Sequence, residues 1–173
     1  MDYIKYETTL KASGKEYSKI VFWNRFLRNP AELILTWLPA AISIICIALG
    51  YFSSYLAVIY AACWCYPIYI FGFQFKNSVN YHLKNRDQSE SAPCTITLME
   101  SGILAEIPEF ELTYNYDWDD FTTIYNKFGY YMLFQQGKMI VMLRQADMPE
   151  PERAAAAEFI KNNIDMNKCR VLF

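Results

Sequence analysis

The sequence predicts a membrane α-helical hairpin joined to an α+β soluble domain, in which an antiparallel β-roll is closed by a C-terminal helix. Three observations lead to this fold class. Residues 33–75 contain no Asp, Glu, Lys, Arg or His, short apolar runs separated by turn residues follow from residue 94, and an amphipathic segment begins at residue 149. The predicted organisation is an N-terminal strand and interfacial helix at 1–30, the hairpin at 31–76, a linker at 77–93 and the β-rich domain at 94–173.

The N-terminal segment begins with "YIKYETTLKA" (Tyr3–Ala12), whose apolar and polar residues alternate as in a strand. "SGKE" then forms a capping box, with Ser13 at the cap and Glu16 three residues later, so a helix should run to about Leu27. This helix is aromatic and basic on all sides. Such a composition fits the headgroup layer of a membrane, and a helix packed on the soluble domain by one face is an equal alternative.

The charge-free stretch predicts two transmembrane helices, at about 33–50 and 52–75, because about 20 apolar residues span the hydrocarbon core. The small and turn-prone residues "GYFSS" (50–54) are expected to form the reversal, with Tyr51 between the two spans. A core helix of a soluble protein keeps a polar stripe, and this stretch has none. Neither span carries an ionisable residue that would mark an ion or proton pathway, so transport by a monomer is not predicted.

Basic residues flank the hairpin on both sides, whereas its connecting turn has no Lys or Arg. Positive charge is retained in the cytoplasm, so both termini are expected there. The flanking basic residues are Lys5, Lys11, Lys15, Lys19, Arg25, Arg28, Lys76, Lys84 and Arg86.

The C-terminal part alternates most cleanly in "FELTYNYDW" (110–118), with Phe110, Leu112, Tyr114, Tyr116 and Trp118 on one face. This face is predicted to be buried. Trp118 and Tyr116 are therefore predicted core residues, and a ligand-stacking role for Trp118 is the alternative. Phe159 and Ile160 are predicted core residues too, on the apolar face of the C-terminal helix that would cover the sheet.

These landmarks suggest a family. "KEYSKIVFWNRF" precedes the hairpin, "TITLMESGIL" opens the C-terminal domain, and "YDWDDFTTIYNKFGYYMLFQQGKMIVML" is followed by a helix with "EFI". The chain resembles the YcxB-like family of small bacterial membrane proteins of unknown function, whose soluble domain is similar to pleckstrin-homology-like rolls. The resemblance implies the bacterial inner membrane and a hairpin inserted into one domain, so that the N-terminal strand joins the C-terminal sheet. It supplies no catalytic residues, and "RQADMPEP" lacks the basic step expected before the helix.

Few residues offer catalytic or cofactor chemistry. His82 is the single histidine, and no phosphate-binding or nucleophile motif is present, so neither enzymatic activity nor a cofactor is predicted. Asp117, Asp119 and Asp120 form an acidic turn whose spacing matches no cation-binding loop. A water-exposed turn without a metal is therefore expected, and a cation site remains the alternative. The five cysteines lack a regular framework, which favours reduced thiols.

Charge separates two functional hypotheses. Residues 90–150 hold ten Asp or Glu and three Lys or Arg, so this region should be repelled by nucleic acid and by an anionic leaflet. We therefore expect a membrane-anchored, non-enzymatic interaction or regulatory protein, with the lipid bilayer and an unidentified protein as partners and no nucleic acid. The alternative is a module that senses inner-leaflet lipid. Its candidate membrane contacts are Lys15, Lys19, Arg25 and Arg28.

Overall fold

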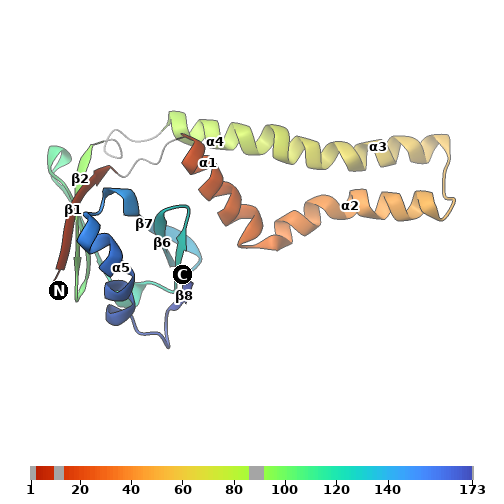
Figure 1. Ribbon diagram of the computed structural model, residues 1–173. Coiled ribbons are helices and arrows are strands. Elements are labelled where there is room, and N and C mark those ends of the chain that lie inside the picture. The colour runs from red at the N-terminus through yellow and green to blue at the C-terminus, as the bar shows by residue number, and fades with distance from the viewer. Residues whose placement is uncertain (1–2, 10–13, 86–91, 173) are drawn as a thin grey trace. The chain divides into compact units, whose positions relative to one another are not determined.

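The computed structural model describes residues 3–9, 14–85 and 92–172 (Figure 1). The chain divides into two compact units. The β unit comprises residues 1–12 and 87–173, and the helical unit comprises residues 13–86. The chain therefore leaves the β unit after its first strand, forms the helical unit, and returns to complete the β unit.

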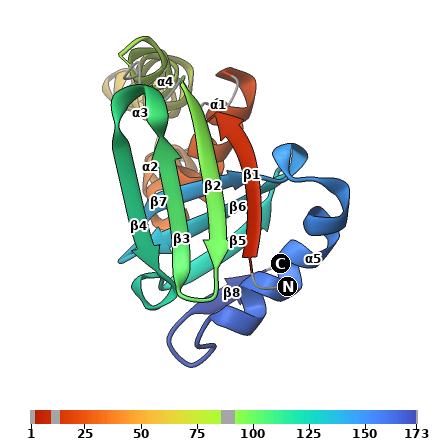
Figure 2. The ribbon, with the colours of Figure 1, turned by 90° about the vertical axis from the view of Figure 1, so that its left-hand side faces the viewer.

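The β unit is an α+β structure with two sheets, and the strands of one sheet run across those of the other in Figure 2. The first sheet is antiparallel, in the order β1-β2-β3-β4, and the second has the order β7-β6-β5-β8, with β8 parallel to β5. The first sheet contains β1 (Tyr3–Thr9), β2 (Pro93–Met99), β3 (Gly102–Ile107) and β4 (Leu112–Asp117). The second contains β5 (Thr123–Lys127), β6 (Tyr130–Gln135), β7 (Lys138–Arg144) and β8 (Arg170–Leu172), and α5 (Glu150–Asn163) lies between β7 and β8 in sequence.

The N-terminal strand is a full member of the first sheet. Ile4 pairs with Leu98 and Tyr6 pairs with Ile96 across β1 and β2. Since directly paired residues share a face of a sheet, the buried residues of β1 join the inner face. The pairing implied for the N-terminal strand is therefore present, although the helical unit separates β1 from β2 in the sequence.

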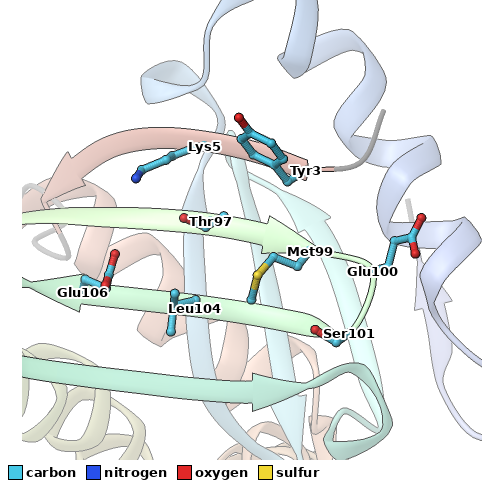
Figure 3. A pocket seen from close by; sticks show the side chains of 8 residues that line it. All are labelled: Tyr3, Lys5, Thr97, Met99, Glu100, Ser101, Leu104 and Glu106. Carbon is cyan, nitrogen blue, oxygen red and sulfur yellow. The ribbon is translucent and has the colours of Figure 1, made fainter.

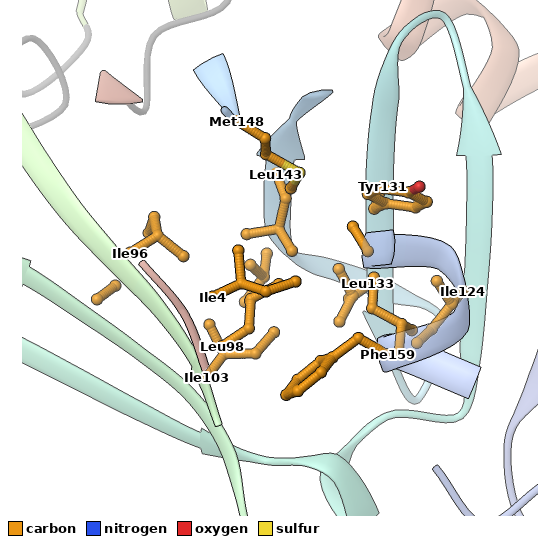
Figure 4. Packing of buried hydrophobic residues seen from close by; sticks show 14 of the residues in the cluster. Ile4, Ile96, Leu98, Ile103, Ile124, Tyr131, Leu133, Leu143, Met148 and Phe159 are labelled. Atoms are coloured by element: carbon orange, nitrogen blue, oxygen red, sulfur yellow. The ribbon is translucent and has the colours of Figure 1, made fainter. Parts of the chain in front are cut away.

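The hydrophobic core of the β unit lies between the two sheets (Figure 4). Apolar side chains from the first sheet face those from the second, and α5 adds Ala156, Phe159 and Ile160 to the same cluster. Each of these residues lies at a position where the strand or helix period turns it inward. Figure 4 labels Ile4, Ile96, Leu98, Ile103, Ile124, Tyr131, Leu133, Leu143, Met148 and Phe159.

The alternating face of residues 110–118 differs from the expectation. Phe110, Leu112 and Tyr114 are 38%, 37% and 40% exposed, and only Trp118 at the end of the run is buried. Leu112 and Tyr114 pair with inward-facing residues of β3, so they do lie on the inner face. However, β4 is one of the two edge strands of its sheet. The prediction of a fully buried face is wrong because these side chains lie at the rim of the core.

The helical unit contains α1 (Gly14–Phe22), a π-helical segment (Trp23–Leu27) and α2 (Pro30–Ala48), followed by α3 (Ser54–Ile68), a π-helical segment (Tyr69–Gln74) and α4 (Phe75–Lys84). Among the described residues, two helices are long and apolar enough to cross a membrane, Pro30–Ala48 and Ser54–Lys84. The helices α2 and α3 lie side by side, and Trp37 contacts Trp64 between them, with ring centres 6.5 Å apart.

One predicted boundary is wrong, and one strand was not predicted. The second helix continues to Lys84, so residues 77–84 of the expected linker are helical. Polar composition concealed Val79 and Leu83, which are one helical turn apart and pack inward. The strand β8 was not predicted either, because a segment of three residues is too short to display a period.

Candidate functional site

A groove lined by three lysines lies between α1 and α4 in the helical unit. Its volume is about 640 Å³. It is lined by Gly14, Lys15, Ser18, Lys19, Phe75, Lys76, Val79, Asn80 and Leu83. The buried Val79 and the half-buried Leu83 give it an apolar floor, whereas the three lysines are exposed. The groove therefore combines an apolar floor with a positively charged rim.

An aromatic cluster fixes the two helices that form the groove. Phe22 and Phe26, one turn apart, contact Phe71 and Phe75, which are also one turn apart. The ring centres are 5.7 Å apart for Phe22 and Phe75 and 4.7 Å apart for Phe26 and Phe71. Aromatic pairs at these separations stabilise a contact beyond the area they bury. The sequence does not reveal this contact, because the two pairs are about fifty residues apart along the chain.

Three lysines from two helices bring positive charge to the groove. Lys15 and Lys19 are one turn apart on α1, and Lys76 lies on α4. Within the described residues, none of the three ammonium groups is within ion-pair distance of a carboxylate. Three positive charges that line one groove repel one another, so an anion bound there would be stabilised.

The two predicted arginines are engaged differently. The Arg25 Nε donates to Glu32 Oε1 at 2.7 Å, and its Nη2 forms an ion pair with the same oxygen. The hydrogen bond to Glu32 raises the pKa of the Arg25 guanidinium above its ordinary value. Arg28 donates through Nη1 to Asn24 Oδ1 at 2.8 Å. Of the four predicted membrane contacts, Lys15 and Lys19 line the groove. Lys76 was not predicted as a membrane contact, because in the sequence it indicated only the orientation of the hairpin.

A second hollow, of about 740 Å³, lies on the outer face of the first sheet (Figure 3). Pairing places Lys5, Thr97 and Leu104 in one row across β1, β2 and β3. The hollow is lined by Tyr3, Lys5, Thr97, Met99, Glu100, Ser101, Leu104 and Glu106, whose side chains appear in Figure 3. Aromatic, thioether and aliphatic groups beside both signs of charge suit a protein contact better than a small anion.

The acidic turn is used for local structure. Asp117 and Asp120 form a capping box around a short 3₁₀ turn, in which the Asp117 backbone N–H donates to Asp120 Oδ2 at 3.1 Å. Asp119 accepts from Lys168 Nζ at 3.1 Å, and this hydrogen bond raises the pKa of Lys168. Across residues 3–9, 14–85 and 92–172, no group of three or more His, Cys, Asp or Glu is placed to hold a metal ion.

The predicted core residues occupy the two sides of the β unit. The Trp118 ring is 4% exposed, and its Nε1 donates to the Met99 carbonyl oxygen at 2.8 Å. Tyr116 is partly buried against the same core. Phe159 and Ile160 of α5 are buried in it. The indole therefore joins the turn after β4 to the end of β2.

A partly buried polar cluster lies where β1 approaches the turn after β7. Thr8 Oγ1 donates to Asp147 Oδ2, and Arg144 Nη1 lies 3.6 Å from Asp147 Oδ1. The nearby Tyr6 hydroxyl is buried and has no hydrogen-bond partner among the described residues. Burial, and secondarily the Asp147 charge, raises the pKa of Tyr6. This cluster ties the N-terminal strand to the second sheet.

Comparison with known proteins identifies no relative: no family model, no curated protein and no solved structure matches the chain.

Proposed function

We propose that this chain is a membrane-anchored, non-enzymatic protein that presents its β unit in the cytoplasm as an interaction or regulatory module. The observation that carries the proposal is the exposure of the two long apolar helices. In the most apolar window of each helix, 17% of residues are buried. The core helix of a soluble protein would be mostly covered. Large exposed apolar surfaces mark contact with a membrane or with another protein.

Connectivity supports a hairpin topology. The strands β1 and β2 are paired in one sheet, and the chain between them contains both apolar helices. Both ends of the hairpin must then lie on the same side of a membrane. The Lys and Arg residues at these ends favour the cytoplasmic side. The resemblance to YcxB-like proteins adds the bacterial inner membrane to this proposal.

The packing of the β unit supports a pleckstrin-homology-like roll closed by α5. Two sheets enclose one core, and Ala156, Phe159 and Ile160 of α5 contribute to it. The strand β8, parallel to β5, would be an addition to such a roll. The outer face of the first sheet remains open to a partner, because Tyr3 on this face is 61% exposed. We assign the protein-binding role to this face.

Topology is tested by labelling in cells. In a background whose native cysteines are replaced, Ser53→Cys in the hairpin turn should react with a membrane-impermeant maleimide in intact cells. The matched change Asn162→Cys, in the β unit, should react only after permeabilisation. Reaction of Asn162→Cys in intact cells would reverse the orientation, and release of the wild-type chain by carbonate would refute membrane anchoring.

The protein-binding role is tested by a photo-crosslinking amino acid at Leu104, on the outer sheet face, with Phe128 as an exposed control position in the same unit. A single crosslinked species is expected from Leu104, and Lys5→Glu should weaken it because it reverses a charge of the same row. Equal crosslinking from Leu104 and Phe128 would show that this face has no specific partner.

A further inference from the structure

We propose that the groove between α1 and α4 binds the headgroup of an anionic phospholipid, with Lys15, Lys19 and Lys76 contacting its phosphates. This inference rests on the proposed membrane anchoring. It names a site and a ligand class for the helical unit, whereas the proposed function assigns protein binding to the β unit.

The position of the groove along the second helix agrees with the depth of lipid phosphates. At about 1.5 Å per residue, the first 20 or so residues of Ser54–Lys84 cross about 30 Å of hydrocarbon. The hydrocarbon therefore ends near Phe75, where the charge-free stretch also ends. Lys76 is the next residue. It lies at the beginning of the headgroup layer, which is roughly 5–7 Å thick on each side.

The helix α1 is held at a matching depth. Phe22 and Phe26 contact Phe71 and Phe75, so this end of α1 lies beside the hydrocarbon boundary. Lys19 is three residues before Phe22, so its Cα lies about 4–5 Å further along α1 from these aromatic contacts. Lys side chains extend along apolar surface toward a polar layer. All three ammonium groups of the groove can therefore reach the same layer of phosphates.

The chemistry of the lining distinguishes a headgroup from a diffuse counter-ion. Three ammonium groups exceed the single charge of one phosphodiester, so a headgroup with two phosphodiesters fits best. The Ser18 hydroxyl and the Asn80 amide add neutral hydrogen-bond donors at the rim. Val79 and Leu83 form an apolar floor on which a glycerol backbone can rest. A free inorganic anion has no use for such a floor.

The helical unit is basic and the β unit is acidic. Residues 13–86 carry seven Lys or Arg and two Asp or Glu, a net charge of +5. Residues 1–12 and 87–173 together carry nine Lys or Arg and sixteen Asp or Glu, a net charge of −7. An anionic leaflet attracts basic segments near its surface. The helical unit is therefore the part of the chain that such a leaflet holds.

The test uses the full chain in detergent micelles, titrated with a lipid carrying two phosphodiesters, with phosphatidylglycerol, or with phosphatidylcholine. Native mass spectrometry measures the bound lipid. We expect saturable binding, tightest for the lipid with two phosphodiesters, weaker for phosphatidylglycerol and weakest for phosphatidylcholine. Each of Lys15→Gln, Lys19→Gln and Lys76→Gln should weaken binding about fivefold. The triple variant should bind on the order of 100-fold more weakly. Lys84→Gln is the matched control, because Lys84 is an exposed lysine of α4 that does not line the groove.

Equal weakening by Lys84→Gln and Lys76→Gln would refute a site and indicate diffuse attraction. Equal binding of phosphatidylcholine, or displacement of the lipid by millimolar inorganic phosphate, would refute the phospholipid assignment. Carbonate extraction separates this inference from the proposed function. The triple variant should resist extraction as the wild type does, whereas release of the wild type would refute anchoring itself.

Discussion

Trp118→Ala tests whether Trp118, the first residue of the 3₁₀ turn, is a core residue or part of a binding surface. The side chain is 4% exposed, its ring centre lies 6.1 Å from that of Phe121, and its Nε1 donates to the Met99 carbonyl oxygen. Truncating a buried aromatic residue typically costs about 3–5 kcal/mol. Loss of the hydrogen bond adds about 1 kcal/mol. Because 1 kcal/mol shifts the melting temperature of a small domain by about 4–8 °C, the variant should melt at least about 15 °C lower.

The assay is thermal unfolding of the full chain in detergent, followed by hydrogen exchange in peptides from β2 to β4. Trp118→Phe keeps much of the apolar contact and removes the hydrogen bond, so its decrease should be smaller than that of Trp118→Ala. Asp119→Asn, whose ion pair with Lys168 is exposed, should leave the melting temperature unchanged. A normally folded Trp118→Ala protein that has lost a binding partner would refute the core assignment.

Two further substitutions test the packing of the first sheet. Gly102→Ala should lower the melting temperature by several degrees or more, because a Cβ there would lie 2.0 Å from the Tyr116 carbonyl oxygen. Gly72→Ala should not, because no atom beyond its chain neighbours and its own helix backbone lies within 4 Å of its Cβ position. Equal melting temperatures would disprove the close β3–β4 approach. Tyr6→Phe should not destabilise the β unit near neutral pH, since its hydroxyl has no partner among the described residues. Burial raises the pKa of Tyr6, so above about pH 10 the tyrosine ionises in the unfolded chain first and the wild type should lose stability. Tyr6→Phe should reduce this loss of stability. Tyr3→Phe, on the exposed face, should not reduce it. An unchanged alkaline slope in Tyr6→Phe would contradict the burial of this hydroxyl.

Local patterns predicted most of the elements. The absence of charge from residues 33–75 identifies two apolar helices, because that property needs no knowledge of distant contacts. Alternation in Tyr3–Thr9 identifies β1, whose burial follows the same two-residue period. These features depend on residues that are close in sequence, and the physics that decides them is local.

Features that depend on distant partners were not predictable in the same way. Alternation places Leu112 and Tyr114 on one face, but only the strand order reveals that β4 is an edge. The groove requires α1 and α4 to meet, and their contact is set by aromatic residues about fifty positions apart. The sequence displayed Lys15, Lys19 and Lys76 as basic residues of two separate segments. Only the fold places them on one groove.

The connection between the groove and the β unit follows from chain order. The helix α1 comes after β1, and α4 comes before β2. These two strands are neighbours, paired through seven positions. A headgroup that bridges Lys15 or Lys19 to Lys76 would restrain α1 and α4, which follow β1 and precede β2 in the sequence. The outer sheet face includes Tyr3, Lys5, Thr97 and Met99 of these strands. The lipid site proposed for the helical unit and the protein-binding face proposed for the β unit are therefore close in chain order.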